Sequence, residues 1–104
     1  MLTYLMLFKL TDQGVQLRRE FPAKIDSLKN IYKDAGVEMK AAYHSTGPYE
    51  GLQIVEAPED STIAKLVLIL ESDGLVRVQT RRLYTVEEYR RMVAELPGIH
   101  IDPL

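Results

Sequence analysis

Length, composition and charge set the first limits on this chain. It has 104 residues, of which 46% are hydrophobic, with a formal net charge of −2 and no cysteine, and these values indicate one ordinary globular domain. The lack of cysteine excludes disulfides, thiolate catalysis and cysteine-ligated metals, and the weak negative charge gives no overall case for binding nucleic acid or an anionic membrane surface.

The first part of the chain predicts a strand followed by a helix. Residues 2–10 are rich in large apolar side chains and predict a strand, not a signal peptide, because they have no basic region or small-residue cleavage site. Apolar residues recur at helical spacing between residues 15 and 35. Pro22 is expected to kink this helix or to begin its main segment, and Gly36 to end it. No apolar run approaches the roughly 20 residues of a membrane span, so we expect a cytoplasmic protein.

The second part predicts a hairpin, a helix, a strand and a last helix. Residues 37–45 and 51–57 predict two strands separated by Gly47-Pro48. Residues 58–61 begin a helix with one apolar stripe, and residues 75–84 predict the fourth strand. Thr85 and Glu88 form a capping box that opens a helix ending before Pro97.

This order of elements predicts the fold class. A β-α-β-β-α-β chain with an added C-terminal helix is the ferredoxin-like, α+β pattern, an antiparallel sheet with both main helices on one face. We assign residues 1–96 to this domain and residues 97–104 to a C-terminal tail. The other face of such a sheet is left open.

Side-chain alternation along the strands predicts what the open face carries. With Tyr4, Met6 and Phe8 under the helices, the opposite face would carry Leu5, Leu7, Lys9, Gln53, Val55, Arg77, Gln79 and Arg81. For residues 37–45, alternation favours neither side. This mixture of apolar and cationic side chains suits a symmetric subunit interface or a ligand cavity between subunits. Cations buried there would need carboxylates, a bound anion or water as partners.

Two groups of side chains are candidates for chemistry. Arg77 and Arg81, with Lys9, could hold a carboxylate or a phosphate through paired hydrogen bonds, or they could form salt bridges between subunits. His44 and Tyr49 could form an acid–base group near the turn, or they could be an edge residue and a hairpin anchor. The candidate ligand-binding set is therefore Lys9, His44, Tyr49, Gln53, Arg77, Gln79 and Arg81. No catalytic residue, metal site or cofactor is assigned.

Several segments, in order along about the first 90 residues, resemble the GYD-domain family of small prokaryotic proteins. The segments that carry the resemblance are Thr3-Tyr4-Leu5-Met6-Leu7, Leu10-Thr11 with Gly14, Gly47-Pro48-Tyr49-Glu50, residues 54–60, and Val76-Arg77. The sequence departs from the family at two positions, where Glu50 replaces the usual Asp and Leu75 replaces the usual Asn. The resemblance implies a dimeric α/β barrel in which two sheets pack through their open faces, and it implies no particular reaction.

Three hypotheses for function follow. The first is a homo-oligomeric binding or regulatory module that holds a small molecule, for which the cations would select an anion. The second is a cofactor-free barrel-type enzyme, monooxygenase-like or isomerase-like, in which Tyr49 and His44 work near Arg77. The third is a purely structural oligomerisation domain whose open face is used up by self-association. The expected partners are a second copy and a small molecule, without nucleic acid or membrane.

Overall fold

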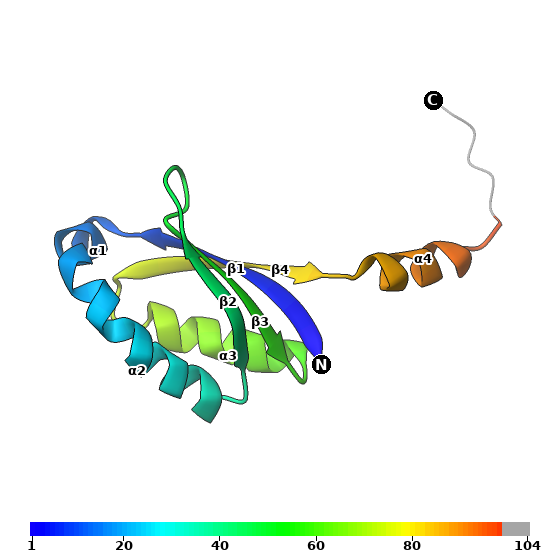
Figure 1. Ribbon diagram of the computed structural model, residues 1–104, viewed down its shortest axis with the longest axis horizontal. Helices are drawn as coiled ribbons and strands as arrows, with labels where there is room; N and C mark the ends of the chain where they lie inside the picture. The colour runs from blue at the N-terminus through cyan, green and yellow to red at the C-terminus, as the bar shows by residue number, and fades with distance from the viewer. Residues whose placement is uncertain (99–104) are drawn as a thin grey trace.

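The structure, a computed structural model, describes residues 1–98. One four-stranded antiparallel sheet in the order β2-β3-β1-β4 carries the helices (Figure 1). The strands are β1 (Leu2–Leu10), β2 (Glu38–His44), β3 (Gly51–Ala57) and β4 (Val76–Leu83), and the helices are α1 (Asp12–Gln16), the short 3-10 helix η1 (Arg18–Glu20), α2 (Phe21–Asp34), α3 (Asp60–Glu71) and α4 (Val86–Ala94). This arrangement confirms the α+β ferredoxin-like fold with a C-terminal helix.

The core lies between the sheet and the helices α2 and α3, which cover the same face (Figure 1). Tyr4 and Met6 of β1 point into it, and Val55 of β3 joins them. Leu66 of α3 and Tyr32 of α2 close the core from the helix side, and each is 1% exposed or less. The side chains of β1 alternate between the two faces of the sheet, and every second one lies under the helices.

Local chemistry explains where the first helical region starts, breaks and stops. The Thr11 hydroxyl accepts a hydrogen bond from the Gly14 backbone N–H and so caps α1. Pro22 lies in the first turn of α2, where its missing N–H costs nothing. Gly36 follows α2 with a φ of 84°, a conformation that favours glycine. Pro22 therefore begins the main helix, one of the two outcomes that the sequence allowed.

The register corrects the predicted faces of β3. Tyr4 lies opposite Val55 and Met6 lies opposite Gln53, so both β3 residues are on the helix-covered face. The prediction that Gln53 and Val55 lie on the open face is therefore wrong. Alternation within a short strand gives two solutions, and the partner strand selects between them.

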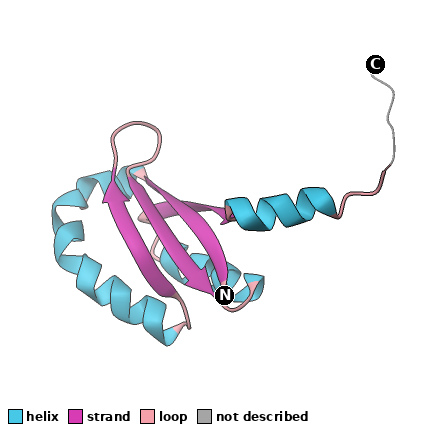
Figure 2. Ribbon diagram, turned by 45° about the vertical axis from the view of Figure 1, so that its right-hand side comes forward, coloured by secondary structure: helices cyan, strands magenta, loops and turns pink. Residues whose placement is uncertain are grey.

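Helix α4 leaves the body of the domain. It continues beyond the end of β4, and neither view shows another element beside it (Figures 1 and 2). The radius of gyration is 17.0 Å, against about 13 Å for a compact chain of this length.

In residues 1–98, no helix has the length and apolar character to cross a membrane. The predicted tail lies outside the described residues from residue 99 onward.

Candidate functional site

The open face of the sheet combines an apolar stripe with a row of polar and cationic side chains. Leu5 and Leu7 of β1 lie opposite Ile54 and Leu52 of β3, and all four are half-buried. On the other side of β1, strand β4 adds three polar residues in register, Arg77, Gln79 and Arg81. The stripe is more apolar than the sequence predicted, because β3 contributes Leu52 and Ile54 in place of Gln53 and Val55.

Two cations of this face lie side by side. Lys9 of β1 is directly opposite Arg77 of β4, and like charges in such cross-strand pairs are destabilising. Among the residues that the structure describes, no carboxylate lies within salt-bridge distance of either side chain. Arg81 is on the same face but about 13 Å farther along β4, by strand rise. Lys9 and Arg77 are therefore two adjacent cations with no carboxylate partner among the described residues.

The loop between β2 and β3 rises on the open side of the sheet (Figure 1) and completes this region. The Tyr49 hydroxyl donates a hydrogen bond of 2.7 Å to Oε1 of Gln79. Gln79 lies one open-face position along β4 from Arg77. The structure thus brings together Tyr49, Gln79, Arg77 and Lys9 of the predicted set. We call these four residues the basic corner.

Glu50 holds the loop in place, a role that the sequence did not predict. Its backbone N–H donates to the Phe8 carbonyl at 2.9 Å, and its carbonyl accepts from the Ser45 N–H at 2.8 Å. Its carboxylate accepts a 3.0 Å hydrogen bond from the Leu10 N–H at the end of β1. The longer acid at this position is therefore engaged with the backbone.

Gln53 lies away from the basic corner. It is on the helix-covered face, where its Oε1 accepts a hydrogen bond from the hydroxyl of Tyr32. Burial raises the pKa of the Tyr32 phenol above its ordinary value, because the charged form would lose its solvation. Gln53 satisfies a polar group at the edge of the core. Gly51, which lies opposite Phe8, has no side chain and so makes room for the Phe8 ring.

His44 is also separated from the basic corner. It lies opposite Gly51, which in turn faces Phe8 on the helix-covered side of the sheet. The acid–base group of His44 with Tyr49 and Arg77 is therefore not assembled within one chain. In residues 1–98, no group of three or more histidine, aspartate and glutamate side chains is placed to hold a metal ion.

Comparison with known proteins finds a family and a relative of similar sequence. The family model described as "GYD domain" matches residues 4–93. The chain is also 35% identical over 79 residues to a protein of Thermus thermophilus named "Glutamine synthetase and cystathionine beta-lyase binding protein". That alignment covers 75% of this chain and 83% of the relative. No solved structure matched the chain.

The chain has the ferredoxin-like α+β fold, with an open sheet face that carries a candidate binding corner. It belongs to the GYD domain family, since the family match spans most of its length. The resemblance noted in the sequence is thus confirmed.

Proposed function

We propose that this protein is a self-associating binding or regulatory module that holds an anionic group at its basic corner. The single observation that carries this proposal is the open face, where an unpaired Lys9–Arg77 couple adjoins a half-buried apolar stripe among the described residues. An exposed apolar stripe rimmed by polar residues is typical of an interaction surface. The Thermus relative is named as a binding protein, which supports a binding role.

Self-association is the first part of the proposal. Leu5, Leu7, Leu52 and Ile54 would bury their remaining surface if the same face of a second copy covered them. A two-fold arrangement of this kind uses one surface patch on both partners. We therefore propose a homodimer of the dimeric α/β-barrel type. We place it in the cytoplasm, because a chain without cysteine fits a reducing compartment.

Anion binding is the second part. The Arg77 guanidinium can hold a carboxylate or phosphate in a bidentate manner, and Lys9 would add a second charge. Tyr49 and Gln79 are already fixed to each other, so they would lose little entropy when a ligand binds. Arg81 extends the basic surface along β4 and would contact a larger anion, or an acidic side chain of the partner copy.

Anion binding is tested by isothermal titration calorimetry and thermal shift, with inorganic phosphate and citrate as the probes. We expect binding by the wild-type protein and its loss in the double variant Lys9→Ala, Arg77→Ala. The matched control is Arg18→Ala with Lys65→Ala, which removes two exposed cations from the helices and leaves the face intact. An assembly that binds no anion would contradict this part and favour a purely structural oligomerisation domain.

A protein partner is a second candidate for what this module binds. The relative's name says that it binds two enzymes, glutamine synthetase and cystathionine beta-lyase, and we propose an enzyme partner for this chain by that similarity. Biolayer interferometry with each purified enzyme tests it, with and without citrate. Binding of either enzyme supports the idea, and equal responses from both enzymes and from serum albumin would refute it.

A further inference from the structure

Tyr43 is an exposed aromatic side chain on the open face of the sheet. It is 67% exposed and lies directly opposite Leu52 of the apolar stripe. The register continues from Leu52 to Leu7 and from Leu7 to Gln79, so these four residues form one row across the open face. Tyrosine is enriched at protein interfaces because its ring is apolar and its hydroxyl is polar. What covers Tyr43 depends on how two open faces meet.

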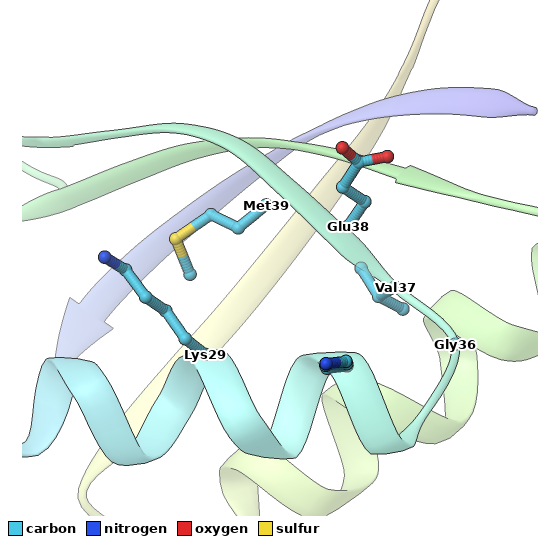
Figure 3. A pocket seen from close by; sticks show the side chains of 6 residues that line it. Lys29, Gly36, Val37, Glu38 and Met39 are labelled. Atoms are coloured by element: carbon cyan, nitrogen blue, oxygen red, sulfur yellow. The ribbon is translucent and has the colours of Figure 1, made fainter.

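One end of the same face carries an acidic pair. Glu38 of β2 lies directly opposite Glu56 of β3, in the row that ends at Leu83 of β4. Glu38 points away from α2 and onto the open face, whereas Met39 beside it points towards α2 (Figure 3). Lys40 pairs with Glu38 at 3.1 Å, and within the described residues Glu56 has no such partner. The acidic pair therefore lacks one cation.

Charge selects how the two open faces meet. When two sheets pack with their strands aligned, a two-fold axis that places the apolar stripe on itself runs either parallel to the strands or across them. The axis across the strands stacks β4 on β4, so it brings Arg77 and Arg81 of both copies together along one edge. Such like-charge contacts are costly. The parallel axis avoids them, because it places β4 of each copy over β2 of the other and keeps each row at its own level.

The parallel axis also supplies the cation that the acidic pair lacks. Leu83 of one copy then lies over Glu38 of the other, and Arg81 is the next open-face residue of β4, about 7 Å along the strand. With the sheets about 10 Å apart, the Cα atoms of Arg81 and Glu38 are about 12 Å apart, a distance that two extended side chains can span. Among the described residues, Arg81 has no carboxylate within salt-bridge distance in its own chain.

The same axis brings Tyr43 of the second copy to the basic corner. Tyr43 and Gln79 are the two ends of one row, on β2 and β4, so Tyr43 of one copy lies over Gln79 of the other. Gln79 accepts the 2.7 Å hydrogen bond of the Tyr49 hydroxyl, and Arg77 is the next open-face residue of β4. Two tyrosine rings, one from each chain, therefore flank the cations Lys9 and Arg77.

We propose that Tyr43 of a second copy completes the basic corner and that the completed site binds an aromatic carboxylate. This inference rests on the proposed self-association and anion binding. The Arg77 guanidinium, with Lys9 beside it, holds the carboxylate. The two tyrosine rings and Leu7 contact the aromatic ring in offset or edge-to-face geometry. Phosphate and citrate fill only the charged part of such a site, because neither has a flat apolar body.

Calorimetry on the wild-type dimer with benzoate, acetate and inorganic phosphate tests the ligand class. We expect benzoate to bind more tightly than acetate, and Tyr43→Ala to weaken benzoate about three- to tenfold without changing the phosphate affinity. The matched control is Tyr89→Ala, which removes a tyrosine of similar exposure from α4, 60% against 67%. Equal affinities for benzoate and acetate would overturn the ligand class.

Mixed dimers test whether Tyr43 acts across the dimer. An Arg77→Ala chain and a Tyr43→Ala chain, each with its own affinity tag, are refolded together, and the dimer that carries both tags is isolated. If Tyr43 comes from the second copy, this dimer has one intact site and one site that lacks both residues. The control joins Arg77→Ala with Lys9→Ala. Because Lys9 and Arg77 of one site belong to the same chain, neither site of the control dimer is intact.

We expect the dimer of Arg77→Ala with Tyr43→Ala to bind one benzoate with the wild-type Kd, and the control dimer to bind it weakly. Weak binding by both mixed dimers, while phosphate still binds the wild-type dimer, would overturn this inference and leave the proposed function standing. A Tyr43→Ala protein that binds benzoate as tightly as the wild type would overturn it as well. A wild-type chain that is monomeric, or that binds no anion, would refute the proposed function itself.

Discussion

The hydrogen-bonded pair formed by Tyr32 and Gln53 gives the sharpest test of the corrected register. If Gln53 lay on the open face, Gln53→Ala would change ligand binding and leave stability nearly unaltered. In the structure, Gln53 accepts the hydrogen bond of the Tyr32 hydroxyl, and Tyr32 is only 1% exposed. The substitution should therefore act on folding.

The expected magnitude follows from the group left without a partner. Removing Gln53 leaves the Tyr32 hydroxyl buried and unpaired, at a cost of about 1–3 kcal/mol. For a domain of this size, each kcal/mol lowers Tm by about 4–8 °C, so Gln53→Ala should lower it by about 5–20 °C. Tyr32→Phe leaves the half-exposed amide, which water can still reach, and should cost about 1 kcal/mol.

Urea unfolding followed by circular dichroism measures both effects at one fixed protein concentration. The double variant Tyr32→Phe, Gln53→Ala completes the cycle, and it should be less destabilised than the sum of the single changes by about 1 kcal/mol. Additive effects, or a Gln53→Ala protein as stable as the wild type, would refute the pairing and with it the register of β3.

Three further predictions concern the stability of the fold. Raising the pH above about 10 should destabilise the protein, because the folded state keeps a Tyr32 proton that the unfolded chain loses. The free energy of unfolding keeps this contribution below pH 10 and falls by up to about 1.4 kcal/mol per pH unit above it. The fall should be less steep in Tyr32→Phe. Gly14→Ala places a Cβ 2.0 Å from a backbone carbonyl oxygen and should cost at least about 2 kcal/mol in urea unfolding, whereas Gly98→Ala, with nothing within 4 Å, should be neutral. Glu50→Ala removes the acceptor of the N–H at the end of β1 and should lower stability by about 1–2 kcal/mol, with Glu59→Ala as an unchanged control.

The fold could be predicted from the sequence because its signals are local. The capping box of Thr85 and Glu88, the turn at Gly36 and the apolar periodicity of each element are contained within a few residues. The strands at 2–10 and 51–57 have the predicted bounds, and the other two strands differ by one residue at each end, where strands fray. The helix predicted between residues 15 and 35 is divided into α1, η1 and α2.

The site was only partly predictable because it depends on strand register. Lys9, Arg77 and Gln79 lie on the open face as alternation predicted, since β1 and β4 alternate clearly, whereas their role in binding stays a prediction. Gln53 was misplaced because Leu52 and Ile54 suit a core as well as Val55 does. His44 could not be placed either, because a register shift between Met39 and Ala41 changes which residues of β2 face the helices, and alternation alone does not reveal such an irregularity.

The role of Glu50 and the projection of α4 were beyond sequence reasoning for a related reason. A backbone acceptor role for a carboxylate depends on which N–H the fold leaves unpaired. The apolar side of α4 looks like any helix that packs on its own domain. Only the arrangement in space shows that this side has no partner among the described elements.

Native mass spectrometry near neutral pH tests the central claim most directly, with the wild-type chain beside Ile54→Lys. The open-face account predicts a wild-type dimer, with a bound anion as reproducible extra mass, and a folded monomer for Ile54→Lys, since a lysine in the middle of the stripe would be buried without a partner. A wild-type protein that is monomeric at micromolar concentration, or an Ile54→Lys protein that is as dimeric as the wild type, would contradict it.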